Sequence, residues 1–463
     1  MKEIKIKNKC IGSGINYIGW SGRGWPDGGA AGAGPISSRA PSWDSYGQEI
    51  GINMVRMGFS IGHFLPEQDI SQHSISDQIK RGLENSEVSW AKSEKTSYCY
   101  AIQRCSDLKW KILGCVNPSY RSWWTPTSIS QTSHSLSIWK VFCFHLAKTI
   151  EENWPGMADH FEITNEPDIG YFDGESYLPH YRGFSGGITP FQYSLLLEAA
   201  YEGVKRAVPG AKIIGPGLAS WNRHWIKEVL SRSGAFLGGL SYHNVGGNLK
   251  DEETLAEAKS LLERDIPQAS GSIFNSEWGW WPNHDIDQQE TALRIAQILH
   301  SQTAGNAFGS LYLGPAQPMG FKKGLGVLRF NPQDPNSVIK TRTFFAFRLM
   351  VRGILEGKKL ELTNPFKKLK ILALLKNRKE LVITIINPSK KRFRSVALNI
   401  DREIPLAKES FLKFYQLDYN HSDSLEIVDS KILKKFDIGA ESIIQLVLSI
   451  SPQRKNNFFL KPE

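Results

Sequence analysis

Strand-like and helix-like runs alternate throughout residues 11–355, and this alternation restricts the fold more than any other feature of the sequence. Short runs rich in β-branched and aromatic residues precede longer runs with apolar residues at helical spacing, and the pair repeats eight times. Eight such pairs predict an α/β fold, a (β/α)8 TIM barrel. An open, doubly wound sheet is the alternative, but Gly12, Gly14 and Gly19 lack the spacing of a phosphate-binding fingerprint.

The predicted barrel domain spans residues 11–355. Its strands are expected at 12–19, 52–58, 110–116, 161–166, 211–215, 240–244, 271–277 and 308–313. Its helices are expected at 43–49, 98–108, 135–153, 190–208, 221–230, 252–263, 288–301 and 337–355. Residues 66–97 are expected to form a long polar connection.

The apolar pattern changes to a period of two beyond residue 356, which is typical of half-buried strands. Strands separated by turns rich in Lys, Asn, Pro and Asp are expected at 360–362, 369–375, 381–386, 395–400, 411–415 and 442–448. The pattern predicts a C-terminal β-sandwich domain over residues 356–463. The alternating segment 1–9 is expected to complete this sandwich with one more strand.

The fourth predicted strand of the barrel ends in Asn165, Glu166 and Pro167. Proline has no N–H to give to a sheet, and it biases the preceding Glu166 towards an extended conformation. The amide and the carboxylic acid are thus displayed at the C-terminal end of a strand, where TIM barrels place their chemistry. Glu162 and Asp168 are expected to point away or to cap the following loop.

Glu277 ends the seventh predicted strand, next to several tryptophans. A retaining glycosidase needs one acid to protonate the leaving oxygen and one carboxylate to attack the anomeric carbon, only ~5–5.5 Å apart. Strands four and seven of a barrel are not neighbours, but their ends face each other across the mouth. Glu166 and Glu277 are therefore candidate catalytic residues for cleaving a glycosidic bond.

Other side chains near these strand ends are candidates for binding a sugar. Arg56, at the end of the second strand, is the best candidate to keep Glu277 ionised. Asn165 is suited to hydrogen-bond a sugar hydroxyl, and His243 to orient a carboxylate or a hydroxyl. The aromatic candidates for stacking on a sugar ring are Trp124, Trp278, Trp280 and Tyr312.

This constellation resembles glycoside hydrolase clan A, the retaining TIM-barrel glycosidases, over residues 11–355. The clan carries its acid/base in an Asn-Glu(-Pro) sequence after strand four and its nucleophile at the end of strand seven. The resemblance therefore implies that Glu166 is the acid/base and that Glu277 is the nucleophile. The run 163–168, the strand around His243 and the trailing sandwich resemble family 39 most.

The sequence departs from the clan pattern at strand six. The clan often has a His-x-Tyr sequence there, with the tyrosine hydroxyl against the nucleophile, whereas Val245 occupies that position here. Either Tyr242 or Tyr312 substitutes for it, or the contact is missing.

The net charge of +10 is concentrated near the C-terminus, where residues 356–463 hold 21 Lys and Arg against 13 Asp and Glu. An anionic polysaccharide is one ligand that such a charge allows. A solvated sheet exterior studded with lysine is the plainer explanation, because lysine also protects sheet edges. No basic helix or interleaved aromatic stripe is seen, so no nucleic-acid partner is expected.

Cysteine usage and hydropathy argue against a disulfide-stabilised protein, a zinc protein and a membrane-spanning protein. The five cysteines are scattered without a Cys-x-x-Cys pair, which argues against a disulfide framework and a zinc site, and no cofactor is expected. No apolar run approaches transmembrane length, and residues 1–7 lack the apolar region of a signal peptide. A chain complete as written is expected in the cytoplasm.

The sequence thus favours a retaining O-glycoside hydrolase of an oligo- or polysaccharide, acting by double displacement. A catalytically inactive barrel that binds a glycan is the alternative from another class, because the strand-six tyrosine is absent. Transglycosylation by the same residues is a third hypothesis.

Overall fold

The structure is a computed structural model of the chain, and everything below concerns the residues that it describes. These are 3–21, 44–65, 72–84, 98–118, 129–168, 171–172, 175–176, 187–245, 251–266, 271–279, 287–313, 316–318, 326–331, 334–377, 379–407, 412–418, 420, 424–428 and 435–451. Within them, no helix is both long and apolar enough to cross a membrane.

Eight parallel strands close into a barrel in the order β10-β11-β2-β3-β4-β5-β8-β9. Their bounds are β2 (Tyr17–Ser21), β3 (Met54–Ser60), β4 (Lys111–Asn117), β5 (His160–Ile163), β8 (Lys212–Leu218), β9 (Gly239–Val245), β10 (Ser272–Gly279) and β11 (Gly309–Leu313). Closure confirms the predicted TIM barrel and rules out the open, doubly wound sheet.

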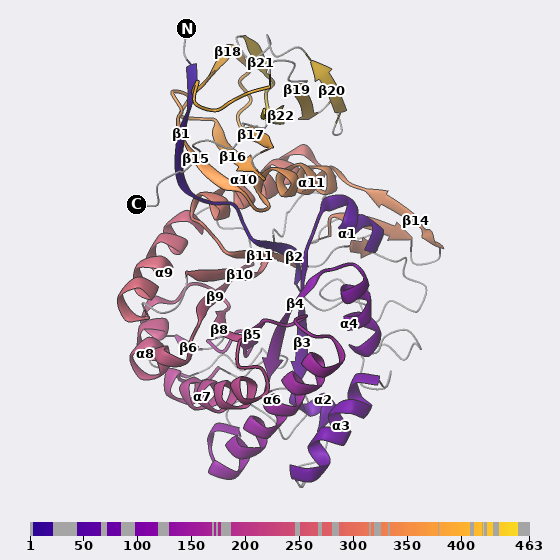
Figure 1. Cartoon of the computed structure of the whole chain (residues 1–463), viewed down its shortest axis with the longest axis vertical. Coiled ribbons are helices and arrows are strands. Elements are labelled where there is room, and N and C mark those ends of the chain that lie inside the picture. The colour runs from indigo at the N-terminus through magenta and orange to yellow at the C-terminus, as the bar shows by residue number, and fades with distance from the viewer. Residues whose placement is uncertain are drawn as a thin grey trace.

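Helices surround this barrel, as Figure 1 shows. They are α1 (Asp44–Ile50), α2 (Ile61–Phe64), α3 (Gln72–Glu84), α4 (Tyr98–Asp107), α6 (Ser133–Asn153), α7 (Pro190–Ala207), α8 (Arg223–Ser233), α9 (Asp251–Asp265), α10 (Gln289–Ala304), α11 (Arg342–Ile354) and the 3-10 turn η2 (Gly234–Phe236). α7 illustrates how the sequence starts a helix: Thr189 and Gln192 form a reciprocal capping box, and Pro190 occupies the first turn.

Residues 66–97 contain a helix where only a polar connection was expected. α3 buries Ile75, Ile79 and Leu83, which are four residues apart and therefore lie on one face of the helix. Three apolar side chains at this spacing are enough to dock an otherwise polar helix against α6. The polar composition of the segment concealed this short pattern.

Two predicted boundaries in the barrel domain were also wrong. The predicted first strand, 12–19, is divided, because β1 (Glu3–Ser13) ends before β2 begins at Tyr17. The last helix begins at Arg342 rather than at Ser337, because 337–340 belong to β14 (Asp334–Lys340). β14 pairs with β13 (Leu328–Asn331), which pairs with β12 (Ala316–Pro318), and β6 (Tyr171–Phe172) pairs with β7 (Glu175–Ser176).

The C-terminal part folds into a nine-stranded mixed sheet, consistent with the predicted β-sandwich, in the order β20-β19-β22-β17-β16-β15-β1-β18-β21. Its strands after β1 are β15 (Lys358–Thr363), β16 (Lys370–Lys376), β17 (Glu380–Asn387), β18 (Phe393–Ile400), β19 (Leu412–Leu417), β20 (Ser424–Val428), β21 (Phe436–Ile438) and β22 (Ser442–Ser449). β20 and β21 were not predicted. β1 pairs antiparallel with β15 and parallel with β18, so the first strand of the chain lies inside the last domain.

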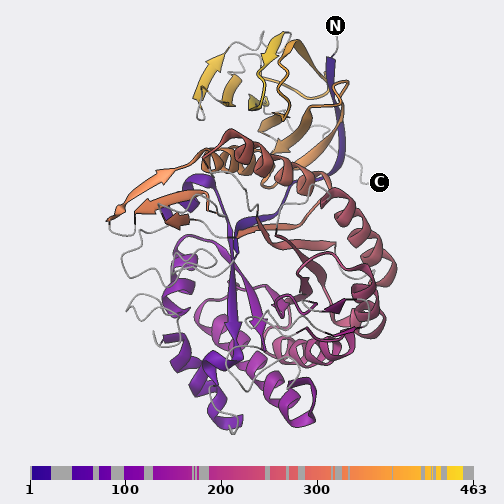
Figure 2. The ribbon, with the colours of Figure 1, turned by 180° about the vertical axis from the view of Figure 1, so that it is seen from behind.

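α10 and α11 lie between the barrel and this sheet, as both ribbon views show (Figures 1 and 2). The helices pack against β16, β17 and β22. Gln445 on β22 is fully buried and donates from Nε2 to the carbonyl of Leu349 on α11 at 2.7 Å. The sheet therefore shares two helices with the barrel.

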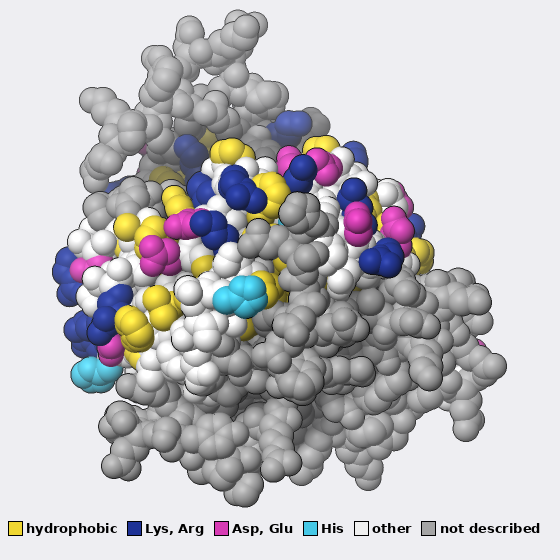
Figure 3. Space-filling model, turned by 90° about the horizontal axis from the view of Figure 1, so that it is seen from below, with side chains coloured by type: hydrophobic (Ala, Val, Ile, Leu, Met, Phe, Trp, Pro, Cys, Tyr) yellow, Lys and Arg dark blue, Asp and Glu magenta, His cyan; other side chains and the backbone are white. Residues whose placement is uncertain are grey.

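Charges of both signs are mixed on the side of the barrel that faces away from the sheet (Figure 3). Lys140 of α6 pairs with Glu202 of α7, and Lys148 pairs with Glu152 one turn along α6 at 3.6 Å. Such exposed pairs contribute little to stability. They do keep this described surface free of a patch of one sign.

The inside of the barrel is a packed apolar core beneath the mouth. Buried side chains from five of the eight strands meet there, namely Met54, Leu113, Ile214, Phe274 and Leu311. Tyr17, Phe308 and His160 close the lower end with edge-to-face and tilted ring contacts. The barrel interior is thus filled by side chains, as expected of this fold.

We predict that Lys359 fastens the sheet to the barrel. Its buried ammonium group donates to the carbonyls of Thr303 and Ala304, at the end of α10, and to Oδ1 of Asn306, at 2.7 to 3.0 Å. Lys359→Met removes these charge-assisted bonds and should lower the free energy of unfolding by about 1–3 kcal/mol in urea titrations. Lys358→Met, at the exposed neighbouring position, should change it by less than about 0.5 kcal/mol. Equal effects of the two substitutions would contradict this role.

Candidate active site

Glu166 and Glu277 meet at the mouth of the barrel although they follow different strands. One carboxylate oxygen of each, together with a ring nitrogen of His243, lie within 4.8 Å of one another. Both carboxylates belong to the C-terminal ends of their strands, after β5 and on β10. This close approach is compatible with the short separation of a retaining pair.

A β-bulge turns Glu277 into the barrel. Asn275 pairs with Tyr242 on β9, yet the next pair along the strands is Glu277 with His243, so β10 holds one extra residue. Phe274 points inward, and strict alternation would therefore point Glu277 outward. The extra residue lets Ser276 and Glu277 both face the interior, which is how bulges re-aim side chains near active sites.

Left-handed backbone conformations place Glu166. Thr164 has a φ of 66° and Glu166 a φ of 49°, which are costly for residues with a Cβ. The Thr164 N–H donates to the carbonyl of Val116, and the Glu166 N–H donates to that of Gly217, both at 2.9 Å. Pro167 was expected to keep Glu166 extended, and this was wrong, because the bond to β8 holds the backbone in the rarer conformation.

Arg56 on β3 connects most of the polar groups beneath the mouth. Its Nη1 donates to Oε2 of Glu277 at 3.0 Å, and its Nη2 donates to Oδ1 of Asn165 at 2.7 Å. Burial acts to lower the pKa of Arg56, but Cys115, Glu162 and Glu277 together raise it. The guanidinium therefore stays charged, contacts Glu277 as predicted, and fixes the orientation of the Asn165 amide.

Glu162 is the site residue that sequence reasoning missed. It points into the barrel, accepts from Nε of Arg56 at 2.6 Å and from Oγ of Ser276 at 2.5 Å, and is fully buried. Burial acts to raise the pKa of Glu162, but the charges of Arg56 and His243 and the hydrogen bonds from Ser276 and Ser241 together lower it. The expectation that Glu162 points away was wrong. A charge in the middle of a buried strand needs a partner, and that requirement was the available signal.

Asp168 caps a loop, but not the loop that follows it in the chain, which was the expected one. Its Oδ1 accepts from the N–H of Ala219 at 2.8 Å, so it caps the loop after β8. Burial raises the pKa of Asp168 to about 6. Its contact is structural and lies beside the reacting groups.

His243 lies against both candidate catalytic residues. Its Nδ1 is 2.9 Å from Oε1 of Glu166, and its side chain is fully buried. Burial acts to lower the pKa of His243, but the charge of Glu277 and the hydrogen bond with Glu166 raise it above its ordinary 6.5. The imidazole thus orients Glu166 and responds to the charge of Glu277.

Neither tyrosine that was considered for strand six contacts Glu277 through a described hydrogen bond. The Tyr242 hydroxyl donates to Oδ1 of Asp251 at 3.1 Å, and Asn244 donates to the same oxygen at 2.9 Å. Asp251 also accepts from Gln302 of α10 at 3.0 Å. These bonds link the two neighbours of His243 on β9 to Asp251 of α9. The described partner of Glu277 is Arg56.

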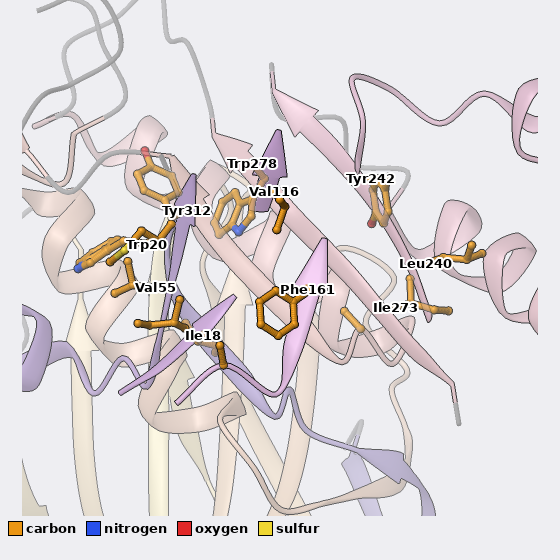
Figure 4. Packing of buried hydrophobic residues seen from close by; sticks show 14 of the residues in the cluster. Ile18, Trp20, Val55, Val116, Phe161, Leu240, Tyr242, Ile273, Trp278 and Tyr312 are labelled. Carbon is orange, nitrogen blue, oxygen red and sulfur yellow. The ribbon is translucent and has the colours of Figure 1, made fainter. Parts of the chain in front are cut away.

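Trp278 and Tyr312 are core residues rather than sugar-stacking platforms. Trp278 has no exposed surface and Tyr312 is 1% exposed. Their rings meet edge to face at 4.9 Å, and both pack on Phe347 of α11, with Trp20 close by (Figure 4). Because Glu277 and Leu311 face inward, the residues that follow them face the helices, which corrects the prediction for both rings. Trp124 and Trp280 lie outside the described residues.

Glu166, His243 and Glu277 are the only His, Cys, Asp or Glu side chains in the described regions that lie close enough to share a metal ion. The geometry offers two carboxylates and one imidazole. Arg56 already neutralises Glu277, and Nδ1 of His243 already engages Glu166. These contacts suit proton transfer and an ionised carboxylate better than a metal centre.

No protein-family model matches the sequence, and no curated protein sequence matches it significantly. Many solved structures share its fold. They include a glycoside hydrolase family 30 endoxylanase from Clostridium papyrosolvens, at 13% identity and a TM-score of 0.66, over 97% of this chain and 100% of that one. A glucosidase from Croceicoccus marinus is similar at 13% sequence identity and a TM-score of 0.67, over 98% of this chain and 100% of that one.

A family 39 β-xylosidase from Caulobacter crescentus is also similar, at 14% identity and a TM-score of 0.63, over 97% of this chain and 100% of that one. Family 39, which the sequence resembles, is therefore among the structural neighbours. At these identities the likeness is one of fold. It extends over the barrel and the C-terminal sheet together.

We predict that the Arg56–Glu162 pair holds the site together. Arg56→Met should lower the free energy of unfolding by about 3–5 kcal/mol, because Glu162 would remain buried without a counter-ion. Adding Glu162→Gln to this variant should restore part of the loss. Urea unfolding of the three proteins measures both effects, and a double variant less stable than Arg56→Met would contradict the pairing.

The same pair predicts a pH dependence. Because Arg56 lowers the pKa of Glu162, the stabilisation is present above the unfolded carboxyl pKa of ~4.3 and is lost as pH falls through the folded value. The stability difference between wild type and Arg56→Met should therefore narrow from about pH 7 to about pH 3. A constant difference would show that charge is not its cause.

We also predict that the pKa of His243 depends on both glutamates. NMR titration of ¹⁵N-histidine should give a value above 6.5 in wild type and lower values in Glu166→Gln and Glu277→Gln. Since folding raises this pKa, its stabilisation is complete below 6.5 and is lost as pH rises through the folded value. Glu253→Gln, at an exposed position of α9, should leave the titration unchanged.

Proposed function

We propose that this protein is a retaining glycoside hydrolase that cleaves an oligo- or polysaccharide by double displacement. The observation that carries the proposal is the approach of the Glu166 and Glu277 carboxylates to within 4.8 Å at the mouth of a closed barrel. The fold shared with a family 30 endoxylanase and a family 39 β-xylosidase supports it. The neighbours are named for different sugars, so the proposal leaves the sugar open.

Glu277 is the proposed nucleophile because its carboxylate is paired with a buried cation. The Arg56 guanidinium lies 3.0 Å from its Oε2, and a nearby cation favours a carboxylate. Its side chain is 16% exposed, so the carboxylate is reachable from the mouth. In the first step Glu277 attacks the anomeric carbon, and the glycosidic bond to the leaving group breaks.

Glu166 is the proposed general acid and base. Its carboxylate faces Nδ1 of His243, which orients it, and the side chain is 18% exposed. Glu166 gives its proton to the leaving oxygen as Glu277 forms the covalent glycosyl-enzyme. In the second step Glu166 takes a proton from water, and the water oxygen displaces Glu277 from the anomeric carbon with overall retention of configuration.

Asn165 is proposed to bind the sugar beside the broken bond. Arg56 holds its Oδ1, which fixes the plane of the carboxamide next to Glu166. A fixed amide can bond a hydroxyl of the sugar without losing much conformational entropy, and such positioning aids the chemical step. His243 and Arg56 act through the two carboxylates in this proposal.

The proposal predicts that Glu166→Gln and Glu277→Gln each reduce hydrolysis of a panel of aryl glycosides and polysaccharides by about 10²-fold or more. A fluoro-sugar that traps the glycosyl-enzyme should label Glu277, and azide should rescue a Glu166→Ala variant on substrates with a good leaving group. Glu253→Gln serves as the matched carboxylate control and should keep full activity.

The same assays separate the other hypotheses. Binding of glycans with no turnover of any of them by the wild type would favour an inactive glycan-binding barrel. Products longer than the substrate would favour transglycosylation, in which a sugar hydroxyl replaces water in the second step. Activity that survives both glutamine substitutions would overturn the assignment.

A further inference from the structure

Two turns of the C-terminal sheet have the same sequence pattern, Asn-Pro-x-Lys-Lys. The first occupies residues 364–368, between β15 and β16, and the second occupies residues 387–391, between β17 and β18. Neither the barrel nor the proposed chemistry uses these turns.

In each turn the asparagine side chain hydrogen-bonds to one backbone N–H and to one backbone carbonyl. Asn364 accepts from the N–H of Phe366 at 2.9 Å and donates to the carbonyl of Leu369 at 2.8 Å. Asn387 accepts from the N–H of Ser389 at 3.1 Å and donates to the carbonyl of Lys391 at 2.7 Å. Asparagine side chains that replace backbone bonds in this way fix a turn. Both turns are therefore preorganised.

An aromatic contact brings the two turns together. Phe366 of the first turn meets Phe393, just after the second, edge to face with ring centroids 5.6 Å apart. Both rings are partly buried. We call the exposed basic residues around this pair the basic tip; they are Lys367, Lys368, Lys390, Lys391, Arg392 and Arg394.

The basic tip carries charge of nearly one sign. The stretches 364–370 and 387–396 contain no Asp or Glu. Asp437 of β21 is the described acidic partner, and it pairs with Arg392 at 2.8 Å. The barrel side in Figure 3 differs, because there both signs are mixed. A concentrated positive field of this kind attracts a polyanion.

The two turns lie at one end of the sheet. β1 approaches the barrel at Ser13, whereas its other end, at Glu3, pairs with Ala397 of β18. β18 begins at Phe393 and is labelled close to the N-terminus in Figure 1. The second turn lies next to the start of α10, because the N–H of Glu441 donates to the carbonyl of Ser389 and Gln289 of α10 donates to the carbonyl of Glu441.

We infer that the basic tip binds an acidic polysaccharide, a glycan chain that carries carboxylate or sulfate groups at intervals. This inference rests on the proposed function, because a second binding site helps a glycosidase to retain the polymer that it cleaves. Lysines on two adjacent turns with fixed backbones match separated anionic groups along a chain, and the partly exposed rings between them suit sugar carbons. The second contact raises the effective concentration of the polymer at the mouth.

The test compares two variants with the same change in net charge. The tip variant changes four lysines to glutamine, namely Lys367, Lys368, Lys390 and Lys391. The control variant changes four exposed lysines elsewhere, namely Lys259, Lys358, Lys379 and Lys413. Binding to polygalacturonate, dextran sulfate and neutral dextran is measured at about 0.02 M and about 0.5 M salt. Equal melting temperatures of both variants and wild type establish that the fold is intact.

The tip variant should bind the acidic polysaccharides about tenfold more weakly than wild type at low salt, as expected for the loss of four exposed charge contacts. The control variant should bind them nearly as wild type does, high salt should weaken binding, and neutral dextran should not bind. Equal losses in both variants would overturn the inference. Tighter binding to duplex DNA or to phosphatidylserine vesicles than to either acidic polysaccharide would overturn it as well.

The two proposals fail separately in these measurements. Hydrolysis of neutral aryl glycosides needs only the mouth of the barrel, so the tip variant should retain it. If the wild type bound acidic polysaccharides through the basic tip but hydrolysed no glycoside, the proposed function would be contradicted. If the wild type hydrolysed glycosides but the tip variant bound acidic polysaccharides as tightly as the wild type, the inferred role of the basic tip would be contradicted.

Discussion

The ion pair between Arg56 and Glu162 is the interaction on which the mouth of the barrel depends. Both side chains are removed from water, and burying two charges is favourable only when each is well bonded. Oγ of Ser276 satisfies the second oxygen of Glu162, and Arg56 uses its remaining N–H groups on Glu277 and Asn165. One buried pair therefore sets the positions of three further side chains, two on β10 and one just after β5.

The sequence was sufficient to predict the barrel, because strand and helix periods repeat eight times and each period has a direct physical cause. It also predicted that Glu166, Glu277, Arg56 and His243 lie near one another at the mouth, as they do in the structure, and their catalytic and binding roles stay predictions. The errors came from structural features that leave no periodic pattern in the sequence. A single bulge decides that Glu277 faces inward and Trp278 outward, and a bond across strands decides the backbone of Glu166.

The C-terminal sheet and the barrel are joined at several levels. β1 inserts the start of the chain into the last sheet, and α10 and α11 present one face to the barrel and the other to the sheet. Lys359 of β15 closes the end of α10. Because α11 also covers Trp278 and Tyr312, disturbance of the sheet would reach the strands that carry Glu277. The second domain thus supports the mouth from outside.

Burial distinguishes the three carboxylates that sequence alone treats alike. The side chains of Glu162, Glu277 and Glu166 are 0%, 16% and 18% exposed. Glu162 lies lowest, between the apolar barrel interior and Arg56, and cannot reach a ligand. Glu277 and Glu166 lie above it, one beside a guanidinium and the other beside an imidazole. Glu162 is therefore a buried structural group, whereas the two upper carboxylates are open to the mouth and are the pair to which the proposed chemistry is assigned.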